Sequence, residues 1–209
     1  MSKKNIQAKN ISGLILAGGE GRRMSGQDKG LIRIADKPLI EYAINCMAPL
    51  VDDLVISCNR NQDLYARYQL ACIADQEAHT DSGYSGPMAG LVAGLKQAKH
   101  DWVLVMPCDT PLMTQNVMAQ LVTGINQCNK IDSQAMVFFH NGLQPLHGIY
   151  HKSMLPVFER SLAENKNALH RLLRSLESVT TLAADCLEHS FNNANDIDEL
   201  KTIEKFLSH

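Results

Sequence analysis

The sequence predicts a three-layer α/β fold, with a mostly parallel central sheet covered by helices on both faces. Short apolar runs at residues 12–17, 53–58, 70–74 and 102–106 alternate with longer stretches of helical spacing. This alternation is typical of βαβ units, and apolar strands of this kind are buried on both faces of a parallel sheet.

Helical spacing predicts helices over residues 39–50, 88–99 and 114–128, the last with Thr114 as its N-cap. The pattern changes after residue 130. Residues 134–139 and 144–150 are predicted strands on either side of His-Asn-Gly, which is a hairpin signal. Helices over 153–163 and 168–177, a strand over 180–184 and a helix over 196–207 complete the prediction.

Composition limits the classes of function. A net charge of −2 argues against sequence-blind binding to nucleic acid, and no apolar run is long enough for a membrane span. The six cysteines form no C-x-x-C pair and the N-terminus is polar, so we expect reduced thiols in a cytoplasmic protein. A chain of 209 residues without a Pro/Gly/Ser linker predicts one domain over 11–209, preceded by a flexible tail over 1–10.

The stretch GLILAGGEGRRMSGQDKGL, residues 13–31, is the main chemical signal. Glycines and cations follow the first predicted strand: Gly18, Gly19, Gly21, Arg22, Arg23 and Lys29. Glycine lets backbone N–H groups approach a ligand, so we expect a polyphosphate site at the carboxyl edge of the sheet. The stretch matches neither the dinucleotide fingerprint nor the Walker A loop, and a solvated glycine-rich loop is the alternative.

Polar residues at the ends of other strands face the same edge in this prediction. Asp109, just beyond the fourth strand, suits Mg²⁺, and the alternative is a helix-capping role. Asp75 ends the third strand, where it would bind a nucleotide hydroxyl or a water on the metal, or simply form a turn. Gly86 begins a tight turn into a helix, whose N–H groups would bind an anion or a base edge, or merely allow close packing.

Together, LAGGEGRRMSGQDKG, GPMAGL and PCDTP resemble the nucleotidyltransferases. The segments DKG, QPL and NNANDIDEL narrow the resemblance to the molybdenum cofactor guanylyltransferases (MobA family), over roughly residues 12–200. This resemblance implies a Rossmann-like nucleotidyltransferase fold and a Mg²⁺-dependent reaction. GMP from GTP would be transferred to the terminal phosphate of molybdenum-loaded molybdopterin, with release of pyrophosphate. Residues 11–130 would form the nucleotide-binding half and residues 131–209 the acceptor-binding half.

The resemblance and the residue patterns together assign roles to particular positions. Arg23, Lys29 and Asp109 would be catalytic, with Asp109 as the metal ligand. The nucleotide-binding candidates are Leu16, Ala17, Gly18, Gly19, Lys29, Ser57, Asn59, Asp75, Gly86 and Asp109. The acceptor-binding candidates by family position are Gln144, Pro145, Asn193 and Asn195. Arg171 and Arg174 are acceptor candidates by charge alone, against a solvated helix face.

The sequence departs from the family pattern at three places. Ser57 stands where a nucleotide-contacting Asn is expected, so either Ser57 makes a shorter contact or Asn59 takes over. Ser-Gly at 25–26 replaces Gly-Gly, and Asn-Asp-Ile at 195–197 replaces Asn-Thr-Pro. His147 and His151 lie four residues apart, but no Cys or carboxylate completes a zinc site, so we expect exposed or hydrogen-bonded histidines.

Other functions remain open at this stage. If the base were cytosine instead of guanine, the chain would be a cytidylyltransferase for molybdopterin. If the acceptor were a sugar or polyol phosphate, it would be a nucleotidyltransferase for that acceptor. A different class is a non-catalytic carrier of GTP and a pterin; intact Lys29 and Asp109 argue against it. Transient contacts with cofactor-delivery or molybdoenzyme-maturation proteins are further possible partners.

Overall fold

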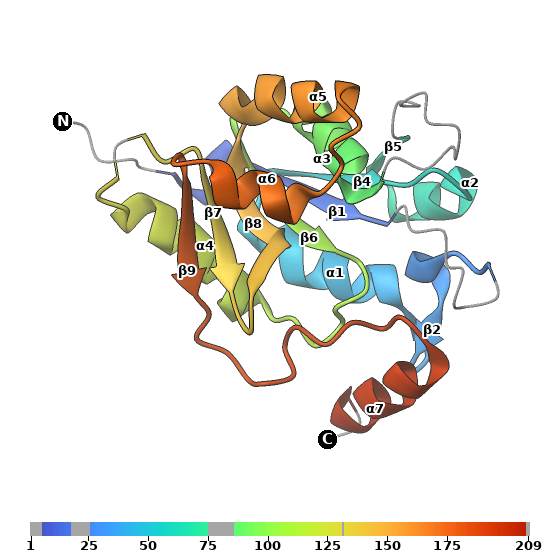
Figure 1. Cartoon of the computed structure of the whole chain (residues 1–209). Helices are drawn as coiled ribbons and strands as arrows, with labels where there is room; N and C mark the ends of the chain where they lie inside the picture. Colours follow the sequence, from blue (N-terminus) through green and yellow to red (C-terminus); the bar gives the residue numbers. More distant parts are fainter. Residues whose placement is uncertain (1–5, 18–25, 75–85, 131, 208–209) are drawn as a thin grey trace.

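Helices cover both faces of a seven-stranded sheet in the computed structural model (Figure 1). The structure describes residues 6–17, 26–74, 86–130 and 132–207. The strands lie in the order β5-β4-β1-β6-β8-β7-β9. Their bounds are β1 Ile11–Leu16, β4 Asp53–Ser57, β5 Ala71–Ile73, β6 Trp102–Pro107, β7 Ala135–Phe139, β8 Leu143–His151 and β9 Val179–Ala183.

The strand pairing confirms the predicted mostly parallel sheet. β1 pairs in parallel with β4 and β6, β4 with β5, and β7 with β9. Only β8 runs antiparallel to both of its neighbours, β6 and β7, within the described part of the chain. The carboxyl ends of β1, β4 and β6 therefore lie at one edge of the sheet, where ligands bind in folds of this class.

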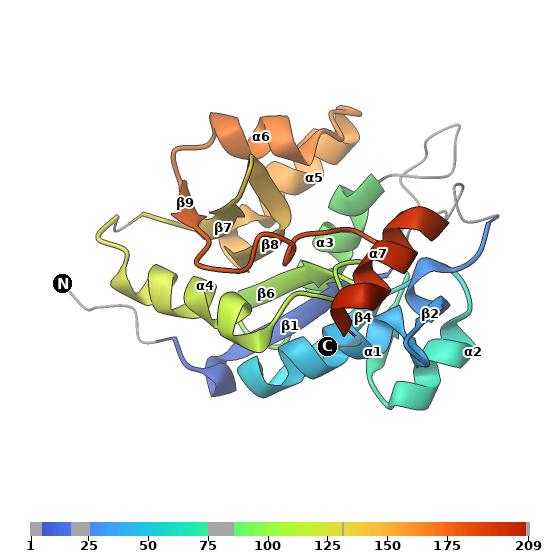
Figure 2. The same ribbon diagram turned by 90° about the horizontal axis from the view of Figure 1, so that it is seen from below.

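Two hydrophobic clusters separate the three layers. Helices α1 and α4 contribute to the cluster on one face, and α3, α5 and α6 to the cluster on the other (Figure 2). The helix bounds are α1 Leu39–Met47, α2 Gln62–Tyr65, α3 Gly86–Gln97, α4 Gln115–Gln127, α5 Leu155–Ala163, α6 Leu169–Ser175 and α7 Ile197–Leu207.

The central strand β1 shows why the apolar pattern leads to this arrangement. All six of its residues are buried, because helices cover it from both sides. Gly94 of α3 lies directly against Leu14: a Cβ at Gly94 would come within 2.2 Å of the Leu14 side chain. Glycine at this position therefore lets α3 approach the sheet closely.

A short hairpin, which the sequence analysis did not assign, joins the C-terminal helix to the sheet. Strands β2 (Arg33–Ile34) and β3 (Lys37–Pro38) pair antiparallel beside α1. Ile34, Leu39 and Ile203 form a small buried cluster, so α7 packs on the hairpin and on the start of α1. Figures 1 and 2 both show α7 beside β2. The last segment of the chain is thereby brought to the edge that carries the candidate site.

Local signals were confirmed at two turns. The Thr114 side chain accepts a hydrogen bond from the Val117 N–H and caps α4 as predicted. The β7–β8 hairpin turns at Asn141 and Gly142, which both have positive φ.

The N-terminal segment differs from the flexible tail expected for residues 1–10. Ile6 is buried, its N–H donates to Asn126 Oδ1 at 2.8 Å, and its carbonyl accepts from Asn126 Nδ2 at 2.7 Å. Residues 8–10 form a 3₁₀ turn. The segment is therefore held on α4 at Ile6, by its apolar side chain and by the matching amide of Asn126. No helix within the described residues is long and apolar enough to cross a membrane.

Candidate active site

The candidate site is built on the carboxyl ends of three adjacent strands. The Ala17 N–H donates to the Ser57 carbonyl at 2.8 Å, and the Cys108 N–H donates to the Leu16 carbonyl at 3.1 Å. Parallel pairing thus continues past the ends of β1, β4 and β6. Leu16, Ala17 and Ser57 are buried, whereas Asn59 is exposed. The strand ends therefore form a buried floor, and the exposed Asn59 lies outside it.

Lys29, Asp109 and Asn195 meet above this floor. Lys29 Nζ lies 2.5 Å from Asp109 Oδ2 and 2.5 Å from Asn195 Oδ1. The Lys29 and Asp109 side chains are 16% and 17% exposed, so water partly reaches the pair. Asp109 and Asn195 lie 80 and 166 positions after Lys29 in the chain. Three sequence-predicted site residues are thus brought into one cluster.

The backbone turn that carries Lys29 is held by Asp28, which is itself fixed by two residues from a distant part of the chain. Lys29 begins a 3₁₀ turn, Lys29–Leu31, and Asp28 caps this turn by accepting from the Gly30 N–H. Tyr65 Oη donates to Asp28 Oδ1 at 2.5 Å, and Asn61 Nδ2 donates to Asp28 Oδ2 at 3.0 Å. Burial raises the pKa of Tyr65 well above its usual range, so the hydroxyl stays protonated as a donor. The sequence analysis had not identified Tyr65 or Asn61.

Gly30 is needed because Tyr65 lies against it. A Cβ at Gly30 would stand 2.4 Å from Tyr65 Oη, closer than real Cβ contacts allow. The backbone of the Asp-Lys-Gly segment therefore packs directly on the buried Tyr65 ring. This contact explains the glycine that follows Lys29 and shows how α2 supports the site.

The segment before α7 contributes Asn195 and also holds Asp109. The Ala194 N–H donates to the Asp109 carbonyl at 2.8 Å. Asp196 Oδ1 accepts from the N–H groups of Asp198 and Glu199, and Glu199 Oε2 accepts from the Asn195 N–H at 2.7 Å. The start of α7 is thus capped by side chains. The Asn-Asp departure from the family pattern is compatible with this cap.

Asp109 has an oxygen that fits a divalent cation. Its Oδ2 accepts from Lys29, while its Oδ1 is buried and has no hydrogen-bond partner among the described residues. A buried, unpaired carboxylate oxygen is costly unless a ligand satisfies it. Mg²⁺ takes one or two carboxylates together with phosphate oxygens and water. The donor set at Asp109 therefore fits Mg²⁺.

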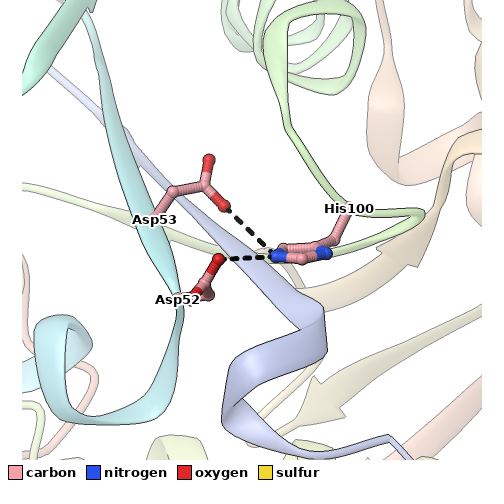
Figure 3. A group of neighbouring side chains, drawn as sticks. All are labelled: Asp52, Asp53 and His100. Carbon is pink, nitrogen blue, oxygen red and sulfur yellow. Dashed lines mark hydrogen bonds and ion pairs between the residues drawn. The ribbon is translucent and has the colours of Figure 1, made fainter.

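A second group of possible metal ligands lies at the opposite edge of the sheet. Asp52, Asp53 and His100 offer ligand atoms within 4.8 Å of one another (Figure 3). Lys99 Nζ and His100 Nε2 already bind Asp52 Oδ2, at 2.6 and 2.9 Å. These two hydrogen bonds lower the pKa of Asp52. Asp53 Oδ1 also accepts from Ser12 Oγ at 2.7 Å, so the ligand oxygens of this group already have partners, unlike Asp109 Oδ1. The group is therefore an ion-pair network that joins the amino ends of β4 and β6.

The predicted acceptor residues are distributed around the same half of the molecule. Gln144 Nε2 donates to the His140 carbonyl at 2.9 Å, and the Pro145 carbonyl accepts from Tyr150 Oη at 2.5 Å. Asn193 is exposed and lines a groove of about 420 Å³ at the start of α7. These contacts bring Asn195, but none of the other acceptor candidates, into the Lys29–Asp109 cluster.

A larger cavity of about 700 Å³ lies between α5 and α6. Its lining includes Arg160, Arg171 and the ion pair of Lys166 with Glu164 at 2.6 Å, so the two arginines leave it cationic. Arg174 is exposed and is not part of the lining. The structure thus separates the two arginines that were candidates by charge alone.

The remaining predicted residues belong to the start of α3 or lie outside the described residues. Gly86 begins α3 with a φ of +69°, a backbone conformation that favours glycine. Gly18, Gly19, Arg22, Arg23 and Asp75 lie outside the described residues.

Comparisons with known proteins show the family to which this chain belongs. Residues 13–180 match the model of the MobA-like NTP transferase domain. A protein of Pseudomonas putida strain GB-1 named molybdenum cofactor guanylyltransferase is 42% identical over 183 residues, which cover 86% of this chain and 92% of that protein. A protein of the same name from Aliivibrio salmonicida is 35% identical over 199 residues, covering 94% and 96%.

The fold comparison leads to the same family. The crystal structure of molybdopterin-guanine dinucleotide biosynthesis protein A from Archaeoglobus fulgidus has a TM-score of 0.77 at 25% identity, and the match covers 94% of this chain and 98% of that one. The chain therefore belongs to the family of MobA-like NTP transferase domains.

Proposed function

We propose that this protein transfers GMP from GTP to the terminal phosphate of molybdenum-loaded molybdopterin. A phosphate oxygen of the acceptor attacks the α-phosphorus of GTP, the bond to the β-phosphate oxygen breaks, and pyrophosphate leaves. The observation that carries the proposal is the cluster of Lys29, Asp109 and Asn195 at the carboxyl edge of the sheet. The names of the relatives support the choice of nucleotide and acceptor.

The reaction needs charge neutralisation and alignment rather than a general base. The acceptor phosphate is already ionised near neutral pH, so no residue has to remove a proton from it. An ammonium has three N–H donors, and Lys29 uses two of them on Asp109 and Asn195. We assign the third donor to the triphosphate of GTP. Arg23 is proposed to act on the same charge.

Asp109 would hold Mg²⁺ through its unpaired Oδ1. The ion would neutralise phosphate charge as pyrophosphate departs. Leu16, Ala17 and Ser57 would bind the nucleotide from the floor of the site, together with the other residues of the sequence prediction: Gly18, Gly19, Asn59, Asp75 and Gly86. Because Asn59 is exposed and Ser57 lies at the buried end of β4, we favour Ser57 over Asn59 as the nucleotide contact.

The acceptor would lie toward the second half of the chain. Asn195 touches Lys29 directly, so we place the acceptor phosphate near it, with Asn193 beside it at the start of α7. Gln144 and Pro145 remain acceptor candidates by family position. The cationic cavity with Arg171 would suit an anionic part of the acceptor.

Residues 11–209 would act as one catalytic domain, and six free cysteines favour a cytoplasmic location.

The test is pyrophosphate release with Mg²⁺, molybdopterin-bound molybdate and each of GTP, CTP, ATP and UTP in turn. Release with GTP alone is the expected result. Release with CTP alone would replace guanylyl by cytidylyl transfer, and no release with any nucleotide would reject the proposed reaction.

Two variants show which carboxylates the reaction uses. Asp109→Ala should abolish release, whereas Asp52→Asn removes a carboxylate of the ion-pair network at the opposite edge and should leave release unchanged. The reverse pattern would move the metal to the group of Asp52, Asp53 and His100.

A further inference from the structure

His147 is a buried histidine to which the proposed reaction gives no task. It lies in β8 and is 3% exposed. Burial lowers its pKa to about 3, so the ring is neutral at physiological pH. Its Nε2 lies 3.0 Å from Thr110 Oγ1, and Thr110 is the residue that follows Asp109. A neutral ring accepts from, or donates to, this hydroxyl.

An irregularity in β8 puts the ring where it can reach Thr110. Gly148 pairs with Val137 of β7, but the next β7 residue, Phe138, pairs with Gln144. Three residues of β8, 145–147, therefore lie opposite no residue of β7. Such a bulge bends a strand and redirects its side chains. The pairing of β8 with β6 also ends at Gly148, opposite Val105, and Thr110 follows the end of β6.

The ring of Phe191 joins this contact to the segment that carries Asn195. Phe191 packs edge-on against His147, with ring centroids 5.0 Å apart, and stacks on His140 at 4.9 Å. It also meets Phe138 edge-on at 5.6 Å. Phe191 and Ala194 are both buried, so the segment 190–195 is anchored at its start by this aromatic group. Its end is fixed by the bond from the Ala194 N–H to the Asp109 carbonyl.

We propose that His147 is a positioning residue, which holds the Asp109 turn (residues 107–111) and the segment 190–195 in fixed relation through Thr110 and Phe191. This inference rests on the function proposed above, because its kinetic test measures that reaction. Two hydrogen bonds hold the turn: the Ala194 N–H donates to the Asp109 carbonyl, and the Thr110 hydroxyl bonds His147 Nε2. Both hydrogen bonds hold the backbone from which the Asp109 side chain extends, and so position its unpaired Oδ1.

Two substitutions separate the hydrogen bond from the packing. His147→Phe keeps an aromatic ring against Phe191 and removes the bond to Thr110, leaving a buried hydroxyl without its partner. His147→Gln carries an amide near the position of Nε2 and is the rescue variant. We expect His147→Phe to lower kcat by about tenfold to a hundredfold, because small misplacements of aligned groups have effects of this size. KM for GTP should stay within about threefold of wild type, and His147→Gln should regain most of the lost kcat.

Thr180→Val is the matched control. Thr180 Oγ1 bonds the buried Ser133 hydroxyl at 2.9 Å, at the β7–β9 side of the sheet and outside the Lys29–Asp109 cluster. This substitution removes a comparable bond and should leave kcat unchanged. Thr110→Val breaks the proposed contact from its other end, so it carries the test if His147→Phe fails to fold. The double variant His147→Phe/Thr110→Val should be no slower than the slower single variant.

A binding measurement gives a readout without turnover. Mn²⁺ titration followed by electron paramagnetic resonance, with GTP present, should show affinity weakened about fivefold or more in His147→Phe and restored in His147→Gln. The inference would be overturned if His147→Phe bound Mn²⁺ with wild-type affinity, or if both variants lost affinity equally. It would also be overturned if the loss matched the unfolded fraction at the assay temperature, or if wild type bound no Mn²⁺. If wild type binds Mn²⁺ but releases no pyrophosphate, the proposed reaction fails while this titration still decides the role of His147.

Discussion

Lys29 and Asp109 form an ion pair of 2.5 Å across 80 positions of the chain, and each partner keeps a further polar group for a ligand. Asp109 retains the unpaired Oδ1, and Lys29 retains one N–H after its bonds to Asp109 and Asn195. The pair thus fixes the positions of a metal ligand and a phosphate ligand relative to each other before substrate arrives. Such preorganisation lowers the cost of aligning two polyanions.

The first prediction concerns this pair. Lys29→Met removes the cation and leaves the Asp109 carboxylate without its donor, so kcat/KM should fall by a factor that corresponds to about 3 kcal/mol or more. Lys29→Arg keeps the charge but not the point geometry, so it should recover only part of the activity. Steady-state pyrophosphate release with GTP measures both variants.

The two side chains should also fail to act independently. Lys29→Met/Asp109→Asn should lose less kcat/KM than the sum of the two single losses, because each single change already disrupts the same cluster. Strict additivity of the two losses would show that the pair does not act as a unit.

The second prediction concerns the contact of Gly30 with Tyr65. Gly30→Ala should destabilise the protein and reduce activity, because the added Cβ would stand 2.4 Å from Tyr65 Oη and would displace the bond to Asp28. The free energy of unfolding should fall by about 1–3 kcal/mol, the usual range for overpacking. Thermal unfolding and pyrophosphate release measure the two effects.

Tyr65→Phe supplies the matched partner for this test. It removes the atom nearest the added Cβ, so Gly30→Ala/Tyr65→Phe should be less impaired than the two single losses together predict. A double variant that simply adds the two losses would mean that the clash lies elsewhere.

The sequence located the strand ends because apolar runs end abruptly there. The run at 102–106 ends in Pro-Cys-Asp, which placed Asp109 correctly beyond β6. Parallel topology then predicted one shared edge. The same reasoning could not show that Lys29 meets Asn195, since 166 positions separate them and tertiary contacts bring them together. These contacts are the packing of α7 on the β2–β3 hairpin and the bond from the Ala194 N–H to the Asp109 carbonyl.

The features that were missed lack a local signal. Ala35 and Asp36 both have positive φ in the β2–β3 turn, where Gly or Asn would have indicated a hairpin. The bulge that redirects His147 has no sequence marker either, and the prediction of an exposed or hydrogen-bonded histidine left its partner Thr110 unidentified.

The third prediction concerns the start of α7. Asp196→Ala removes the oxygen that accepts from the Asp198 and Glu199 N–H groups, so unfolding should become easier by about 1 kcal/mol. Activity should also fall, because the same turn orients Asn195 against Lys29. Thr114→Ala removes the cap of α4, and its stability loss should come with unchanged kcat/KM. Equal kcat/KM in the two variants would contradict a role for α7 in the site.

The last prediction uses the buried ring of His147 as a probe of acid stability. The folded protein keeps the pKa of His147 at about 3, against 6.5 for an ordinary histidine. Between these values the unfolded chain binds a proton that the folded protein does not. The contribution of His147 to stability is therefore complete above pH 6.5 and decreases as the pH falls toward 3, by up to about 1.4 kcal/mol per pH unit.

His147→Phe should remove this dependence. Its loss of a hydrogen bond to Thr110 is the same at every pH, so it cancels when stabilities at pH 7.5 and pH 5 are compared. Urea unfolding should show that wild type loses about 2 kcal/mol more than His147→Phe over this interval, since one proton is taken up over about 1.5 pH units. Thr180→Val, which retains His147, should follow the wild-type dependence. Equal acid sensitivity in wild type and His147→Phe would mean that folding does not lower the pKa of His147, so that the ring is already protonated at pH 5 in the folded protein.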